Sequence, residues 1–341
     1  MHVGLVFNQR RTLRTAGPEP GNVLPNDVEA EWDDPETIQA VADALSSRHR
    51  VTRIEADEDA FETLRSRRPD LVFNMAEGAT GASRESQIPA MLEMLGIPYT
   101  ASDPITLGIC LDKSRTKEIL AHHGIPTPSY AVVENATDLN GQISPPAVVK
   151  PLWEGSSKGV TNDSLARDYA ALRQKVGDVL KAYDQPALVE AYLPGREFTA
   201  ALLGNGPDVR VLPLIEMDFS VLPVDANPLY SYEAKWVWDK PADPLPLFQC
   251  PADVDDALEH RIEATARQAF CALRCRDWAR IDLRLDGEGV PHIIEVNPLP
   301  GILPKPEDNS CFPKAARAAG LSYEDLILAV VDQACKRYGI A

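Results

Sequence analysis

The stretch RIDLRLDGEGVPHIIEVNPLPG, residues 280–301, decides the fold of the C-terminal part of the chain. Apolar residues alternate on both sides of the turn-forming DGEG, which predicts a β-hairpin. Side chains along a strand repeat every two residues, so Arg280 and Asp282 share one face of the first arm, and Glu295 and Asn297 share one face of the second. Any register that pairs an even-numbered residue with an odd-numbered one places all four side chains on the same side.

In the register that puts Asp282 opposite Glu295, two carboxylates lie roughly 5 Å apart at Cβ, and such a like-charge pair destabilises a sheet. A divalent cation between them would reverse this effect, since Mg²⁺ is usually held by one or two carboxylates together with phosphate oxygens. We therefore expect Asp282, Glu295 and the amide of Asn297 to bind metal. The alternative is an exposed polar face neutralised by Arg280, which leaves the Pro-Leu-Pro-Gly run at 298–301 unexplained.

Composition limits the class of protein. The chain has 341 residues, of which 44% are hydrophobic and 25% charged, so it can bury a large core in two or three domains. The formal charge of −17 argues against nucleic acid or an anionic membrane as partner. Apolar runs are shorter than the ~20 residues of a membrane span, and the N-terminus resembles a first strand rather than a signal peptide. We expect a cytoplasmic protein in which Cys271 and Cys275 are buried thiols.

Strand and helix patterns alternate over the first hundred residues, which predicts a mostly parallel sheet. The long segment 8–33 follows the first strand, where ligands bind in open α/β sheets, and is a candidate substrate loop. A surface insertion without function is the alternative. We predict an N-terminal α/β domain at 1–102, followed by two α+β lobes at 103–188 and 189–341.

Residues 148–160, VVKPLWEGSSKGV, put a lysine at the end of a strand and a Gly-Ser-Ser loop after it. The backbone N–H groups of such a loop can cover phosphates. The sequence has no P-loop signature, and GNGPDV lacks the third glycine of a dinucleotide-binding fingerprint. The loop alone is weak evidence for a nucleotide site.

Several motifs taken together indicate the class of protein more specifically than this loop does. They include VFNMAEG, LDKSRTKEILAHHGIPTP, VVKPLWEGSSKGV, LVEAYLPGREFTAALLG, YSYEAKW, the hairpin and SCFPKAARAAGLSYEDLI. In this order and spacing they resemble the D-alanine–D-alanine ligase family of the ATP-grasp superfamily, over nearly the whole chain. The resemblance implies an N-terminal parallel-sheet α/β domain followed by a two-lobed ATP-grasp fold. It also implies an ATP-dependent carboxylate–amine ligase that forms an amide through an acyl phosphate, with two Mg²⁺ ions (or Mn²⁺), amino-acid or carboxylic-acid substrates and a possible homodimer.

The resemblance also implies roles for individual residues. On the nucleotide side it implies phosphate contacts from Lys113, Lys150, Lys235 and the loop serines Ser156 and Ser157. It also implies adenine contacts from the backbone of the segment with Glu190, Tyr192 and Leu193, and a ribose contact from Glu197. The implied metal ligands are Asp282, Glu295 and Asn297. Arg280 and the Gly301 amide would hold an oxyanion, with Ser156 and Lys235 also in the catalytic set. Ser156 and Ser310 would face the amino acid.

The sequence departs from the family on the amino-acid side. The usual N-terminal glutamate cannot be aligned, a family histidine is missing where Glu77 and Arg84 stand, and Trp236 replaces a tyrosine or phenylalanine. A substrate ammonium needs a carboxylate partner, which Glu77 or an acid of the long loop (Glu19, Glu29 or Glu31) would supply. The substrate therefore stays open between D-alanine and a different amino acid or small acid, as in mycosporine-like amino acid ligases. A nucleotide-binding protein that does not ligate is a third possibility, disfavoured by Arg280, Gly301 and Ser156.

Overall fold

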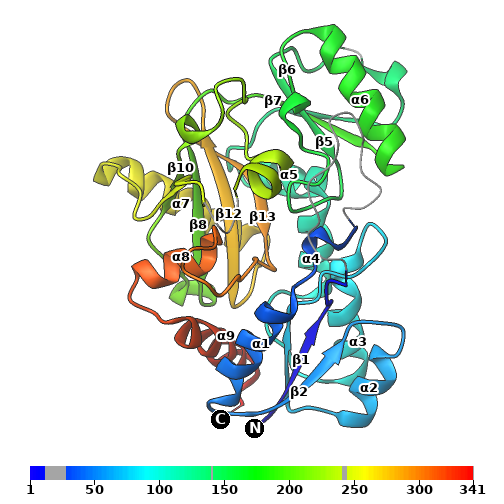
Figure 1. Cartoon of the computed structure of the whole chain (residues 1–341), viewed down its shortest axis with the longest axis vertical. Helices are drawn as coiled ribbons and strands as arrows, with labels where there is room; N and C mark the ends of the chain where they lie inside the picture. The colour runs from blue at the N-terminus through cyan, green and yellow to red at the C-terminus, as the bar shows by residue number, and fades with distance from the viewer. Residues whose placement is uncertain (12–27, 140, 240–243, 341) are drawn as a thin grey trace.

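The described part of the chain folds around three β-sheets with helices packed on them (Figure 1). The computed structural model describes residues 1–11, 28–139, 141–239 and 244–340. The strands are β1 His2–Phe7, β2 Arg50–Glu55, β3 Leu71–Asn74, β4 Tyr130–Val133, β5 Ala147–Pro151, β6 Leu165–Ala166, β7 Ala187–Ala191, β8 Glu197–Leu203, β9 Arg210–Val211, β10 Ile215–Met217, β11 Phe248–Gln249, β12 Trp278–Leu285 and β13 Pro291–Asn297. The α-helices are α1 Pro35–Ser46, α2 Ala60–Arg67, α3 Gln87–Leu95, α4 Pro104–Leu111, α5 Lys113–His122, α6 Tyr169–Tyr183, α7 Asp256–Ala272, α8 Cys311–Ala318 and α9 Tyr323–Tyr338.

The N-terminal sheet is parallel, in the order β2-β1-β3, as the alternation of strands and helices predicted. Helix α1 starts where the Asp34 carboxylate accepts the Thr37 N–H at 2.9 Å, with Pro35 at the first helical position. The long segment leaves β1 at its carboxyl end and returns through a short 3₁₀-helix, Val28–Glu31. A bridge between Gln9 and Asp33 holds the two ends of that segment side by side, so the 3₁₀-helix lies at the edge of the sheet where ligands bind.

The second sheet is antiparallel, in the order β4-β7-β5-β6. Helix α6 packs on it through Leu172, Val176 and Val179, which recur at helical spacing. The predicted boundary at residue 188 falls inside β7, all of which pairs within this sheet. The division into three domains stays a prediction.

The third sheet has the order β11-β10-β8-β12-β13, with β9 paired to the end of β8. The hairpin is β12–β13, and its register is the one anticipated: Arg280 opposite Asn297, and Asp282 opposite Glu295. The register shifts directly after Asp282, because Leu283 pairs with Ile293 and leaves Ile294 as the extra residue of a bulge. The four polar side chains therefore lie on one face, as predicted, and the pairing changes immediately beyond them.

The N-terminal sheet and the third sheet share one hydrophobic core. Trp278 of β12 makes edge-on ring contacts with Phe73 of β3 and Phe312 of α8, with centroids 5.8 and 5.4 Å apart. Helix α9 returns along α1, and the two chain ends lie close together at the foot of the molecule (Figure 1). Arg337 of α9 pairs with Asp277 at 2.7 Å. With this packing, Arg10, just beyond the carboxyl end of β1, lines the same cavity as Arg280 and Asp282 of the hairpin.

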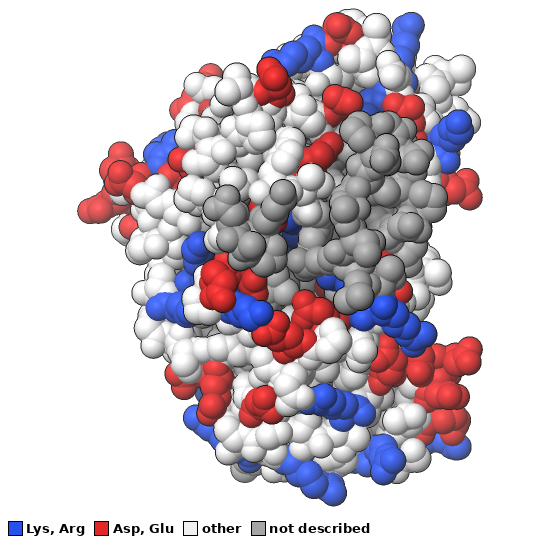
Figure 2. All heavy atoms as spheres, viewed as in Figure 1, with Lys and Arg blue, Asp and Glu red and all other residues white. Residues whose placement is uncertain are grey.

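The prediction that Cys271 and Cys275 are both buried thiols was confirmed for Cys275 and wrong for Cys271. Cys275 is buried, but Cys271 is exposed, because α7 ends at Ala272 and the two thiols do not share a helix face. Within the described ranges, no three His, Cys, Asp or Glu side chains group as a metal site, and no helix combines the length and apolarity needed to cross a membrane. Acidic and basic side chains are interspersed over the coloured part of the face in Figure 2.

Candidate active site

Two adjoining cavities lie between the second sheet, the hairpin and the N-terminal domain, with volumes of about 230 and 90 Å³. Apart from the loop acids Glu19 and Glu29, every residue given a site role from the sequence lines one or both. The larger cavity is lined by Lys113, Lys150, Ser156, Ser157, Glu190, Tyr192, Leu193, Glu197, Lys235, Trp236, Arg280, Asp282, Glu295, Gly301 and Ser310, and the smaller one by Glu77 and Asn297 among others. The predicted residues are thus brought together, although their roles stay predictions.

The polar face of the hairpin forms the floor. Asp282 accepts hydrogen bonds from Arg280 at 3.0 Å and from the Asn297 amide at 3.2 Å. Glu295 pairs with Lys113 of α5 at 3.0 Å. Burial alone would raise the pKa of Glu295, but Lys113 and Lys150 outweigh it and lower the pKa to about 2. Arg280 does neutralise Asp282, as the alternative interpretation held, but only 9% of Asp282 is exposed, so this face is part of a cavity wall.

A buried triad of ion pairs holds Lys150 and Lys117 in the cavity wall. Glu190 of β7 pairs with Lys150 of β5 at 2.7 Å and with Lys117 of α5 at 2.5 Å. The two lysines lower the pKa of Glu190 although burial alone would raise it. Sequence reasoning missed Lys117, which lies four residues after Lys113 and therefore on the same side of the helix. The Glu190 side chain thus acts as a counter-ion within the wall.

The far end of the larger cavity contains another missed residue, Arg284. It donates to Glu197 at 2.9 Å and to the Tyr192 hydroxyl at 2.9 Å, and its guanidinium lies 4.8 Å from the centre of the Tyr192 ring. Burial raises the pKa of Glu197 to about 7, and Arg284 only partly opposes it. The period of two along β12 could have found Arg284, since it shares the parity of Arg280 and Asp282.

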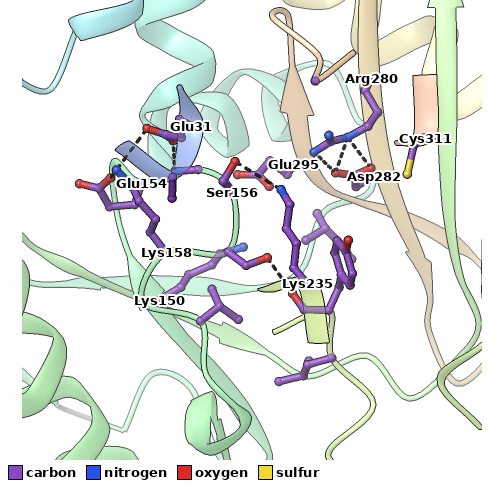
Figure 3. Close-up of a pocket in the computed structure, with 18 of the residues that line it drawn as sticks. Glu31, Lys150, Glu154, Ser156, Lys158, Lys235, Arg280, Asp282, Glu295 and Cys311 are labelled. Atoms are coloured by element: carbon purple, nitrogen blue, oxygen red, sulfur yellow. Dashed lines mark hydrogen bonds and ion pairs between the residues drawn. The ribbon is translucent and has the colours of Figure 1, made fainter. Parts of the chain in front are cut away.

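Two segments from different lobes meet across the opening (Figure 3). Ser156 and Ser157 have φ of 50° and 60°, left-handed values that non-glycine residues rarely adopt. Ser157 Oγ donates to the Tyr230 carbonyl at 2.8 Å, and Trp236 Nε1 donates to the Ser156 carbonyl at 3.2 Å. Lys235 lies 3.3 Å from Ser156 Oγ. The Gly-Ser-Ser loop and the 230–236 segment are therefore joined.

Lys235 itself is half-buried beneath this junction. Burial, and next the nearby Arg280, lower the pKa of the Lys235 ammonium to about 8. Ser310 closes the neighbouring loop by donating to the Gly301 carbonyl and accepting from the Leu303 N–H, both at 3.1 Å. A Cβ at Gly301 would meet no described atom within 4 Å apart from its chain neighbours, so glycine is not required there for space.

The acids from the N-terminal domain differ in their surroundings. The Glu31 carboxylate pairs with Arg84 at 2.9 Å and with Lys158 at 3.1 Å. Glu77 and Glu85 line the smaller cavity, and neither makes a hydrogen bond or ion pair with the rest of the described chain. Burial, reinforced by Glu85, raises the pKa of Glu77 well above its ordinary value, and burial raises that of Glu85 to about 7 in spite of Arg84.

The remaining two loop acids do not contribute described atoms to the site. Glu29 accepts the Arg11 N–H at 3.0 Å and is not among the residues that line either cavity. Glu19 lies outside the described residues.

Comparison with known proteins assigns the family. The family model for the D-ala D-ala ligase C-terminus matches residues 119–332. A D-alanine–D-alanine ligase of Desulforudis audaxviator is 36% identical over 305 residues, covering 88% of this chain and 92% of the relative. The chain belongs to the D-alanine–D-alanine ligase family. The resemblance drawn from the sequence motifs is thereby confirmed.

Two further relatives of this D-alanine–D-alanine ligase family member complete the comparison. A protein of Sinorhizobium fredii called uncharacterized protein y4sG is 36% identical over 316 residues, covering 90% of both chains. The structure of a D-alanine–D-alanine ligase from Bacillus anthracis complexed with ATP superposes with a TM-score of 0.72 at 23% identity, over 99% of both chains. The predicted fold class is confirmed by this likeness.

Proposed function

We propose that this family member is an ATP-dependent carboxylate–amine ligase that forms an amide bond through an acyl phosphate. The observation that carries the proposal is the convergence of Arg280, Lys150 and Lys235 on a cavity floored by the Asp282–Glu295 pair. Cations from three segments surround two carboxylates that lie directly opposite each other. Phosphoryl transfer needs positioning and electrostatic stabilisation more than covalent help, and such a set of charges supplies both.

Asp282, Glu295 and Asn297 would hold Mg²⁺. The donor set fits, because two carboxylates and an amide oxygen are hard oxygen ligands on one sheet face. The Asn297 amide nitrogen donates to Asp282, which leaves its oxygen available as a donor to metal. The ion would neutralise phosphate charge when bound.

The nucleotide would lie along the larger cavity. Lys150 and Lys235 would face its phosphates, and Glu197 its ribose. The Tyr192 N–H is bonded to the Pro146 carbonyl at 3.1 Å, whereas the Leu193 N–H has no backbone partner among the described residues and is available to adenine. The Bacillus anthracis ligase is complexed with ATP, which supports ATP as the nucleotide by analogy.

The chain's own groups would then guide the chemistry. Arg280 and the Gly301 N–H would stabilise the oxyanion that forms when an amine attacks the activated carboxylate. The joined Gly-Ser-Ser loop and 230–236 segment would exclude water, which otherwise hydrolyses an acyl phosphate. The Ser310 hydroxyl bonds to the backbone of both Gly301 and Leu303, and it would therefore set the position of Gly301.

Glu77 and Trp236 bear on which substrates the cavity accepts. An amino-acid ammonium would pair with Glu77, since the Glu31 carboxylate is already bound to Arg84 and Lys158. Trp236 in place of a smaller aromatic residue supports the second candidate, a ligase for another amino acid or small acid. A cytoplasmic location, a homodimer and the exclusion of nucleic acid and membrane stay predictions.

The proposal is tested by measuring ADP and phosphate release over a panel of amino acids and small carboxylic acids, offered singly and in pairs with ATP and Mg²⁺. Mass spectrometry of the products identifies any amide. A ligase releases phosphate in step with an amide product from one or more pairs. ATP binding without any such product across the panel would favour the non-ligating protein.

A further inference from the structure

Four charged side chains, three of them buried, join the Gly-Ser-Ser loop to the N-terminal domain. Glu31 ends the 3₁₀-helix Val28–Glu31, Arg84 begins another at Arg84–Ser86, and Glu154 and Lys158 flank the loop. Arg84 lies 2.9 Å from Glu31 and 3.6 Å from Glu154, and Lys158 lies 3.1 Å from Glu31 and also pairs with Glu154. The side chains of Arg84, Glu31 and Lys158 are only 4–7% exposed. Figure 3 labels Glu31, Glu154 and Lys158 at one side of the cavity.

The Glu31 carboxylate has no capacity left for a further donor. Arg84 Nη2 lies 2.9 Å from each of its oxygens, Lys158 Nζ lies 3.1 Å from Oε2, and the Gly155 N–H donates to Oε1 at 2.9 Å. An ionised carboxylate offers about four acceptor sites, and these contacts occupy them. Burial alone would raise the pKa of Glu31, but Arg84 and Lys158 outweigh it and keep the pKa below its ordinary value.

The loop backbone is shaped to reach this carboxylate. A Cβ at Gly155 would come within 2.5 Å of Glu31 Oε1, so the glycine permits the close approach. Arg84 also donates to the Trp153 carbonyl at 2.8 Å, which ties the start of the loop to the same group. Three consecutive loop positions are therefore held by two residues of the N-terminal domain.

We propose that Glu31, Arg84 and Lys158 form a latch that holds the Gly-Ser-Ser loop closed over the cavity, with Glu31 as a positioning residue and not as the acceptor of a substrate ammonium. The consequence for catalysis rests on the proposed ligase function, whereas the latch itself does not. Two cations and two carboxylates balance within the cluster, so removal of one member leaves a buried charge unpaired. The loop then opens to relieve it.

The latch is tested by hydrogen–deuterium exchange on the full chain without nucleotide, comparing Glu31→Gln, Lys158→Met and Lys158→Arg. Peptides spanning 153–160 should exchange at least about tenfold faster in Glu31→Gln and Lys158→Met, because the opened state becomes more populated. Lys158→Arg keeps the charge and should stay near the parent. The matched control is Arg65→Met, which breaks an exposed pair with Glu62 and should change nothing at 153–160. Parent-like exchange in Lys158→Met, or in a folded Glu31→Gln, overturns the latch.

A second measurement separates the latch from an ammonium site once a productive substrate pair is known from the panel. With an open loop, Glu31→Gln should release more phosphate than amide, because water reaches the acyl phosphate. A selective rise of about tenfold in KM for the amino acid, with coupled product formation and normal exchange, would make Glu31 an ammonium ligand and refute the proposal. If no pair turns over, the ligase proposal fails while the exchange data still decide the latch.

Discussion

Asp282 lies directly opposite Glu295 across the β12–β13 ladder, and each carboxylate has its own cation: Arg280 for Asp282 and Lys113 for Glu295. The repulsion expected between two facing acids is thus offset before any metal binds. Arg280 comes from the same strand as Asp282, whereas Lys113 lies on a helix 182 positions before Glu295, so the pair is stabilised only after the lobes assemble.

Glu295→Gln is expected to abolish ADP formation, because it removes a proposed Mg²⁺ ligand. Loss of the Lys113 pair should also lower the free energy of unfolding by about 1–3 kcal/mol, since the buried Lys113 loses its charged partner. Urea unfolding checks the second effect and shows whether the assay is run on folded protein. A folded variant with parental turnover would contradict the metal assignment.

Lys150→Ala and Lys235→Ala are each expected to reduce kcat/KM for ATP by well over tenfold, which is more than ~1.4 kcal/mol. The exposed Lys181→Ala is the matched control and should show almost no change.

Lys235 also predicts a pH dependence. Its pKa of about 8 is below the ordinary lysine value, so its positive charge is lost as pH rises through 8. The profile of kcat/KM for ATP should fall above that pH, and Lys235→Arg should move the fall to higher pH because a guanidinium stays charged. A basic limb unchanged in Lys235→Arg would assign it to another group.

Arg284→Met is expected to weaken ATP binding about tenfold or more, because it leaves Glu197 buried without its cation. The pKa of Glu197, about 7 with Arg284 present, should rise further. The carboxylate would then be protonated over a wider range, so the acid-side fall in kcat/KM for ATP should shift upward in pH. Glu197→Gln should remove that titration altogether, and its persistence would exclude Glu197.

Limited proteolysis should cut the segments 154–160 and 225–247 more slowly with ATP and Mg²⁺ than in the free protein, where the latch already limits opening of 154–160; residues 240–243 lie outside the described part. The bonds from Ser157 to Tyr230 and from Trp236 to Ser156 join the two covers, so a ligand beneath them stabilises both. Cleavage at equal rates with and without nucleotide would argue against a closing lid.

D-alanine is expected to be a poor first substrate. Glu31 is occupied by the latch cations, and the bulk of Trp236 reshapes the wall next to Ser156. Kinetics with D-alanine alone, compared with other acid–amine pairs, measure this preference. Efficient ATP-dependent formation of D-alanyl-D-alanine would show that the peptidoglycan substrate is accepted.

Local patterns in the sequence were sufficient for many features. The period of two along β12 and β13 predicted the shared face of Arg280, Asp282, Glu295 and Asn297, because strand geometry alone sets that parity. The Asp34–Pro35 start of α1 followed from capping chemistry. Motif spacing assembled a list of site residues, all of which line the two cavities.

Ion pairs between residues far apart in the sequence could not be predicted from such local patterns. Glu31 meets Lys158, Lys113 meets Glu295, and Arg284 meets Glu197, each across 87 or more positions of sequence. The packing of the sheets and their helices determines which side chains become partners, and no local periodicity in the sequence encodes that packing. The sequence by itself therefore determined the family, the sheets and the candidate residues. The tertiary structure alone decided which charges neutralise one another, because ion pairs form between side chains that packing brings within a few ångströms.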